Sequence, residues 1–132
     1  SPIQGCTLNP AFSGVEIDIM ESFKPGYVSH AVHWNGCGED LQSKGKQSFP
    51  LEATPDGFHR FGLRWNKTGY TFFVDGKETW HVDGPVSETE QFILVSTECM
   101  GYRTEEEKPC TEVQGSAPDE FVVDYVRVFD EI

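Results

Sequence analysis

The stretch Gly14-Val15-Glu16-Ile17-Asp18-Ile19-Met20-Glu21 alternates apolar and acidic residues over most of its length. Successive side chains of an extended strand point to opposite faces, so Glu16 and Asp18 share one face and the apolar residues between them pack on the other. Glu21 breaks this alternation, because its odd offset from Asp18 would send its side chain into the core. A β-bulge at Ile19-Met20 would return Glu21 to the acidic face, and bulges are frequent beside active sites. The stretch therefore predicts a bulged, half-buried strand.

The rest of the chain also alternates with a period of two, between turns marked by Gly and Pro. We expect strands at Gly14–Glu21, Tyr27–Trp34, Phe58–Trp65, Tyr70–Val74, Glu78–Val82, Gln91–Glu98 and Glu120–Phe129. Asp75-Gly76 is typical of a two-residue hairpin, because Gly accepts the positive φ that such a turn requires. Asn66–Gly69 is a second turn, and no segment has a convincing helical period. The fold class is all-β, a sandwich or jelly roll.

The composition limits the classes of partner. A chain of 132 residues corresponds to a single domain, here residues 1–132. Its net charge of −12 argues against binding to nucleic acid or to an anionic membrane surface, since both need clustered Lys and Arg. No apolar run approaches the ~20 residues that span a bilayer. The start at Ser1-Pro2-Ile3 has no charged or apolar leader, so we expect any signal peptide to be already removed.

Four cysteines, Cys6, Cys37, Cys99 and Cys110, allow three disulfide pairings. Cys99 and Cys110 flank a short polar loop and form the favoured pair, which leaves Cys6 to join Cys37. Zinc is a weaker alternative, because no C-x-x-C or H-x-x-x-H spacing supports it, and four free thiols are the alternative in a reducing compartment. Asn66 begins an N-glycosylation sequon in a turn. Together these features favour a secreted, extracellular protein.

The acidic face has a chemical interpretation. Two carboxylates a few ångströms apart are the machinery of glycoside hydrolysis, in which one attacks the anomeric carbon and the other protonates the leaving oxygen. A third carboxylate between them raises its neighbour's proton affinity by like-charge repulsion. The alternative is a solvated acidic face on an edge strand, which is the commonest origin of a charge cluster. The apolar residues on the other face indicate burial there, and like charges this close cost stability unless they have a function.

The segment Glu16-Ile17-Asp18-Ile19-Met20-Glu21 resembles the signature of glycoside hydrolase family 16 in its bulged form, which is typical of laminarinases, agarases and carrageenases. Phe58–Trp65 and Tyr70–Gly76 look like the paired strands of that family, Phe92–Glu98 like its cleft strand and Val123–Val128 like its closing strand. The resemblance covers nearly the whole chain and implies a concanavalin A-like jelly roll. It also implies that Glu16 is the nucleophile, Asp18 the assisting carboxylate and Glu21 the acid/base.

Domains of that family are much longer, and this chain begins just before the strand that resembles the catalytic one. The absent N-terminal strands carry aromatic residues that line subsites for distant sugars. Their absence would leave strand edges unpaired. We therefore expect a companion chain, a processed precursor or a partial sequence, with residues 1–132 forming the catalytic C-terminal portion of a larger jelly roll.

Two residues are candidates for substrate contact near the carboxylates. His33 lies where the family commonly has a cleft histidine, on a strand face that would also carry Ser29 and Ala31. A histidine held by a surface carboxylate is the alternative. Arg64 alternates with core residues, so its side chain points outward, and the cleft is one of the places it could reach.

Three further candidates lie toward the C-terminus. Leu94, Ser96 and Glu98 share a face, and the resemblance places Ser96 and Glu98 in the glycone part of the cleft; an ordinary exposed face is the alternative. Asp124 matches the position of a structural calcium in many family members. One carboxylate is far from the six or more oxygen ligands that calcium requires, so the other ligands would have to come from elsewhere.

We therefore predict a retaining endo-hydrolase of β-1,3- or mixed β-1,3-1,4-glucans that needs no cofactor for catalysis. The rival within the family is hydrolysis of a galactan such as agarose, although the net charge of −12 disfavours highly sulfated carrageenan. The rival of another class is a non-catalytic, lectin-like β-glucan-binding module. Such modules typically lose the two glutamates that this sequence keeps.

Overall fold

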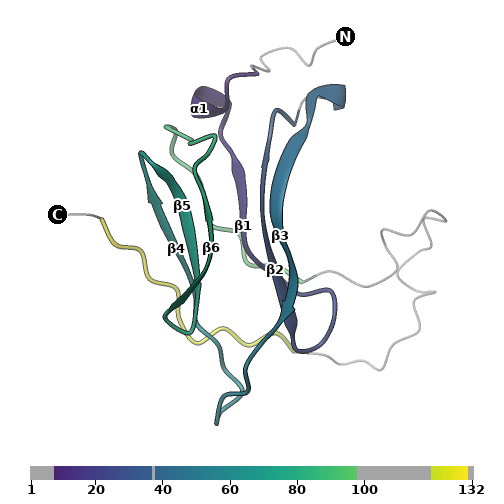
Figure 1. The fold of residues 1–132 in the computed structure, drawn as a ribbon. Helices are drawn as coiled ribbons and strands as arrows, with labels where there is room; N and C mark the ends of the chain where they lie inside the picture. Colours follow the sequence, from purple (N-terminus) through teal and green to yellow (C-terminus); the bar gives the residue numbers. More distant parts are fainter. Residues whose placement is uncertain (1–7, 37, 98–119, 131–132) are drawn as a thin grey trace. The chain divides into compact units, whose positions relative to one another are not determined.

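The computed structural model describes residues 8–36, 38–97 and 120–130. The chain divides into two compact units, Ser1–Gln91 and Phe92–Ile132, and the helices and strands of the described residues lie in the first. Its elements are α1 (Pro10–Ser13), β1 (Glu16–Glu21), β2 (Tyr27–Trp34), η1 (Gly38–Asp40), β3 (Gln42–Pro50), β4 (Phe61–Asn66), β5 (Gly69–Val74) and β6 (Lys77–Val82). The described residues form six strands and little helix. The strands lie in two layers (Figure 1), so the prediction of an all-β fold is confirmed.

Each layer is a three-stranded antiparallel sheet of consecutive strands, β1-β2-β3 and β4-β5-β6 (Figure 1). The apolar faces of the two sheets meet in one core. Its buried members are Val15, Val32, Tyr70, Phe72 and Val82, with Ile17, Trp34, Leu63 and Trp80 packed against them. Because the apolar side of β1 is taken up by this core, the acidic side of β1 must face away from it.

Two tight turns join the strands of the second sheet, as the sequence predicts. Asp75 and Gly76 both have positive φ, 51° and 82°, which is the geometry of a two-residue hairpin that matches strand twist. The Asp75 carboxylate accepts hydrogen bonds from the Arg60 amide (2.9 Å) and from His59 Nδ1 (2.8 Å). At the other turn, a Cβ on Gly69 would lie 2.2 Å from the carbonyl oxygen of Val82, so that position accepts no side chain.

The sequence analysis did not predict β3. This strand pairs with β2 over almost its whole length, from Tyr27 opposite Pro50 to Trp34 opposite Gln42. It has no neighbour on its other side among the described residues, and its sequence, QSKGKQSFP, has no apolar alternation. Edge strands commonly carry Lys and Pro, which discourage pairing with other chains. The pattern that reveals a half-buried strand is therefore absent here.

Helix content was also underestimated, by one turn. Asn9 caps α1 by accepting a hydrogen bond from the Ala11 amide (3.1 Å), and Pro10 begins the turn. A single capped turn is too short to show a helical period. No helix among the described residues is long and apolar enough to cross a membrane.

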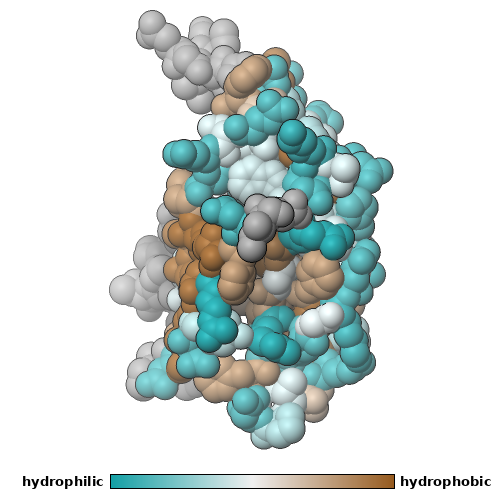
Figure 2. Space-filling model, turned by 90° about the vertical axis from the view of Figure 1, so that its left-hand side faces the viewer, coloured by the Kyte–Doolittle hydropathy of each residue, from teal (hydrophilic) through white to brown (hydrophobic). Residues whose placement is uncertain are grey.

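The two C-terminal strands expected at Gln91–Glu98 and Glu120–Phe129 are not observed among described residues 91–97 and 120–130. A strand is defined by its hydrogen-bonded ladder with a neighbour, and these extended, apolar segments have no such ladder there. Their large side chains are exposed instead, with Phe92 at 87% and Phe129 at 82%. Figure 2 likewise shows hydrophobic residues at the surface between hydrophilic ones. Exposed apolar area of this kind is typical of surfaces that bind another part of a protein.

Candidate active site

The register between β1 and β2 brings the three carboxylates to one face. Glu16 lies opposite His33 and Asp18 opposite Ala31, and then the register shifts so that Glu21 lies opposite Ser29. Three residues of β1 thus correspond to two of β2, which is the β-bulge that the sequence predicts at Ile19-Met20. Directly paired residues point to the same side of a sheet, so the odd offset of Glu21 is cancelled.

The rest of this face is built from small residues. Ala31 pairs with Gly45 of β3, and His33 pairs with Ser43 of β3. We call the side of the first sheet that carries Glu16, Asp18, Glu21, Ser29, Ala31, His33, Ser43 and Gly45 the carboxylate face. Ser43 and Gly45 were missed from the sequence because β3 was not predicted. The alternation of small residues with Lys44 and Lys46 is the signal that could have indicated them.

His33 connects the carboxylates to β3. Its Nε2 lies 3.1 Å from Asp18 Oδ2, and its Nδ1 forms a hydrogen bond with the Ser43 hydroxyl. The contact with Asp18 is a close approach rather than an aligned hydrogen bond, since Asp18 Oδ2 has no hydrogen-bond partner among the described residues. The structure therefore brings His33 to the carboxylates. In the alternative interpretation a carboxylate merely holds this histidine, and that carboxylate is Asp18.

Asp18 has a raised proton affinity. Burial raises its pKa, the negative charges of Glu21 and Glu16 raise it further, and the result is about 6 against an ordinary value of 3.8. The charge of His33 acts in the opposite direction. A hydrogen bond with the Glu16 carboxyl adds to the rise, because it favours the protonated form of Asp18. The protonated form of Asp18, which persists up to a pH of about 6, can therefore donate a hydrogen bond to Glu16.

One ligand atom each from Glu16, Asp18 and His33 lies within 4.8 Å of the other two. Among the described residues this is the one group of acidic or histidine side chains close enough to share an ion. Asp124 is not part of such a group, and the structural calcium that the family resemblance implies at Asp124 stays a prediction.

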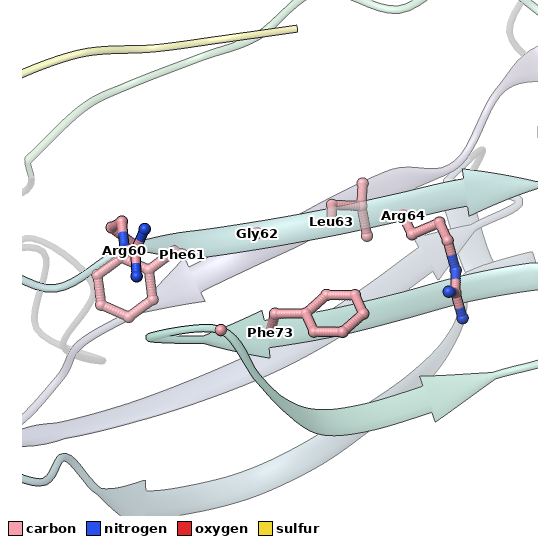
Figure 3. Close-up of a pocket in the computed structure, with 7 residues that line it drawn as sticks. Arg60, Phe61, Gly62, Leu63, Arg64 and Phe73 are labelled. Atoms are coloured by element: carbon pink, nitrogen blue, oxygen red, sulfur yellow. The ribbon is translucent and has the colours of Figure 1, made fainter. Parts of the chain in front are cut away.

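Arg64 lies elsewhere. It pairs with Thr71 and donates a hydrogen bond to the Thr71 hydroxyl (3.3 Å), while its neighbours Leu63 and Trp65 point to the core side. Together with Arg60, Gly62 and Phe73 it lines a shallow pocket of about 270 Å³ (Figure 3). This pocket is on the outer side of the second sheet, whereas the carboxylate face is the outer side of the first. Arg64 is thus separated from the carboxylates by the whole core.

The other candidates lie in the second unit, in a turn of the second sheet or outside the described residues. Ser96 is exposed and, like Asp124, belongs to the second unit. Glu98 and the cysteines Cys6, Cys37, Cys99 and Cys110 lie outside the described residues, so their roles and pairings stay predictions. Asn66 is at the end of β4, where its Oδ1 accepts hydrogen bonds from the amide (2.9 Å) and hydroxyl (2.7 Å) of Thr68. The sequon therefore sits in the turn where it was expected.

The chain is similar in sequence to known glycosyl hydrolases. The family model described as glycosyl hydrolases family 16 matches residues 7–100. The beta-agarase AgaB34 of Agarivorans albus is 30% identical over 96 residues, which represent 56% of this chain and 21% of that protein. This chain thus spans about one fifth of the length of the curated relative it matches, and no solved structure matches it. Because the matched region holds all six strands and the whole carboxylate face, the chain belongs to glycosyl hydrolases family 16.

Proposed function

We propose that this chain carries the catalytic machinery of a retaining endo-glycoside hydrolase that acts on β-linked glycans. The observation that supports this most directly is the bulge in β1, which places Glu16, Asp18 and Glu21 on one face around a carboxyl with a raised pKa. A solvated acidic face has no need for a bulge, for burial of its middle carboxyl or for a histidine against it.

Each carboxylate has a role in a double displacement. A Glu16 oxygen attacks the anomeric carbon while Glu21 gives its proton to the departing glycosidic oxygen, so the glycosidic bond breaks as the glycosyl-enzyme ester forms. Glu21 then takes a proton from water, the water oxygen attacks the same carbon, and Glu16 leaves. Asp18, protonated, donates a hydrogen bond to Glu16 and limits the repulsion among the three groups.

The first test replaces each glutamate by its neutral isostere. We expect Glu16→Gln and Glu21→Gln to lower glycan hydrolysis by about 1,000-fold or more with the fold intact, because each removes a group that acts on the reacting atoms. With a dinitrophenyl β-glycoside, whose first displacement needs no acid, azide should restore turnover to Glu21→Ala and release a β-glycosyl azide, since azide attacks the glycosyl-enzyme without base assistance. Glu52→Gln is the matched control, because Glu52 is exposed and forms an ion pair with Lys77 on the second sheet. Full activity in either catalytic-site variant would refute the proposal.

For the substrate we propose β-1,3- or mixed β-1,3-1,4-glucan first, since laminarinases carry the bulged signature, although agarases and carrageenases share it. Agarose is a second candidate, which the identity to a beta-agarase favours. Laminarin, lichenan and agarose should be assayed side by side, with viscosity measured against reducing ends so that internal cleavage is told from cleavage at chain ends. Binding of a glycan without release of reducing ends would instead indicate a lectin-like module.

We also propose that the protein acts outside the cell. An oxidising compartment suits a Cys99–Cys110 disulfide and a second disulfide between Cys6 and Cys37, and the Asn66 sequon is compatible with it. Peptide mapping of the secreted protein without reduction tests both bonds. Four free thiols in such material would contradict the proposal.

A further inference from the structure

His30 lies on the core side of the bulge that brings Glu21 to the carboxylate face. Its neighbours Ser29 and Ala31 pair with Glu21 and Asp18, so His30 is the β2 residue opposite Ile19-Met20. It is only 1% exposed, and its side chain points into the apolar core rather than toward the carboxylates. A buried imidazole is costly unless its polar atoms are hydrogen-bonded, so its partners reveal what it does.

Both ring nitrogens of His30 have partners. Nδ1 lies 2.7 Å from the carbonyl oxygen of Ile19, and Nε2 lies 2.8 Å from the Thr79 hydroxyl of β6. A carbonyl oxygen can only accept, so Nδ1 carries the proton. Burial lowers the pKa of His30. The Thr79 hydroxyl that contacts Nε2 also donates a hydrogen bond to the Phe72 carbonyl oxygen (3.2 Å), so this contact ties the ring to the second sheet. The Nδ1–H group thus donates its hydrogen bond to Ile19, one of the two bulge residues.

The ring itself is held on both sides. The Phe72 ring of the second sheet lies 4.8 Å from the His30 ring, centroid to centroid, and the Phe49 ring of β3 lies 5.4 Å away. Thr79 is the extra residue where β6 shifts register against β5, between the pairs Phe72–Trp80 and Phe73–Glu78. The donor that reaches Ile19 is therefore anchored by both sheets, and its position is fixed independently of β1.

We propose that His30 is a positioning residue that fixes the β1 bulge and thereby aims Glu21 at the leaving-group oxygen. This rests on the proposed role of Glu21 as acid/base. A bulge interrupts the ladder and leaves one residue without a cross-strand partner, so the ladder alone holds that part of β1 weakly. A slip of one residue would turn Glu21 toward the core. The hydrogen bond from His30 to Ile19 opposes that slip from the buried side.

The test compares two substitutions of His30 by amide side chains, each of which replaces a different nitrogen of the imidazole ring. The side-chain amide of His30→Asn can place a donor near the position of Nδ1 and keep the bond to Ile19. The longer amide of His30→Gln reaches toward Thr79 and leaves Ile19 without its donor. Thr79→Val is the control for the link between the sheets, because it removes the partner of Nε2 and leaves Nδ1 untouched. Thermal unfolding and circular dichroism of all three variants of the full chain report folding.

The decisive readout is the dependence of rate on the leaving group. Cleavage of the glycan requires proton donation by Glu21, whereas dinitrophenolate departs from a dinitrophenyl β-glycoside of the same sugar without it. The later hydrolysis of the glycosyl-enzyme, in which Glu21 acts as base, is common to both substrates and does not enter kcat/KM. We expect His30→Gln to lower kcat/KM for the glycan by about 10- to 100-fold, and to change kcat/KM for the dinitrophenyl glycoside by less than about 3-fold. His30→Asn and Thr79→Val should stay within about 3-fold of the parent on both substrates.

Glu21→Gln separates this inference from the function it rests on. It should show the same selective loss in a more severe form, and if it does not, the proposed role of Glu21 is wrong. If Glu21→Gln shows the selective loss but His30→Gln slows both substrates equally or neither, only the positioning role fails. If His30→Gln does not fold, His30→Asn and Thr79→Val decide the question. Selective loss in Thr79→Val, or in a folded His30→Asn that keeps its donor, would overturn the inference.

Discussion

Asp18 and Glu21 point to the same side of the first sheet although they are three residues apart in the sequence. Their partners in β2, Ala31 and Ser29, are only two residues apart, and the bulge in β1 absorbs the difference. The negative charge of Glu21 is the largest electrostatic contribution to the raised pKa of Asp18, after burial. The bulge thus determines both where Glu21 stands and how strongly Asp18 holds its proton.

The free energy of unfolding should depend on pH through the protonation of Asp18. Its folded pKa of about 6 lies above the ordinary 3.8, so the folded state binds the proton more tightly than the unfolded state does. The contribution to stability is therefore complete at acid pH and is lost as pH rises through about 6. Asp18→Asn is neutral at every pH and should gain roughly 1–3 kcal/mol relative to the parent between about pH 4 and pH 7.5. Urea unfolding at both pH values measures this, and an offset that does not change with pH would contradict it.

The neighbours of Asp18 should move its pKa in opposite directions. Glu21→Gln removes a negative charge and should lower the pKa of Asp18, whereas His33→Gln removes a group that lowers it and should raise it. A carbon-detected NMR titration of the Asp18 carboxyl follows each variant directly. Equal shifts of the same sign would show that the two side chains do not act on Asp18 through their charges.

The small residues of the carboxylate face should be needed for access to the site. Ala31 is half-buried between Asp18 and Gly45, and its side chain points to the carboxylate side. A leucine there would occupy the space beside Asp18 that a sugar ring must enter, so Ala31→Leu should lower kcat/KM by about 100-fold or more. Ala31→Ser adds one small polar atom and serves as the control. Unchanged kinetics in Ala31→Leu would mean that the glycan does not cross this part of the face.

Two turn glycines should differ in their tolerance of a methyl group. Gly69 has φ 133°, and a Cβ there would lie 2.2 Å from the Val82 carbonyl oxygen and 2.8 Å from the Asp83 Cα atom. Gly76 also has positive φ, 82°, but a Cβ there would meet nothing within 4 Å. Gly76→Ala should cost about 1 kcal/mol for its backbone conformation alone, and Gly69→Ala several times more because backbone must move. Chemical denaturation of the two variants tests the difference, and equal losses would show that the contact at Gly69 relaxes freely.

The edge of β1 should be covered in the active protein. Within the described residues β1 has one strand neighbour, β2, and its apolar side is part of the core. Unpaired backbone groups beside a core cost on the order of 1–3 kcal/mol each, so we expect further strands to pair there. They could belong to a longer chain or to a companion polypeptide. Native mass spectrometry of active material distinguishes these cases, and a species with the mass of these 132 residues that hydrolyses glycan would contradict the expectation.

Much of the site could be predicted from the sequence, because residues close together in the chain determine the conformation of β1. The offsets of Glu16, Asp18 and Glu21 fix which faces their side chains can take, and only a bulge reconciles all three with a buried apolar side. The hairpin at Asp75-Gly76 is likewise local, since two consecutive residues with positive φ set its geometry. Where neighbouring residues alone determine a conformation, the sequence is sufficient to predict that conformation.

What only the tertiary structure decided involves partners far apart in the chain. Strand β3 has no apolar period, because an edge strand packs little, so Ser43 and Gly45 became visible only through their pairing with β2. His30 could be assigned to the core side from alternation, but its bonds to Ile19 and to Thr79, forty-nine residues away, come from two sheets packing together. The position of Arg64 was decided in the same way. Alternation turned it outward, and only the packing of the sheets showed that its outward side is the far side of the core from the carboxylates.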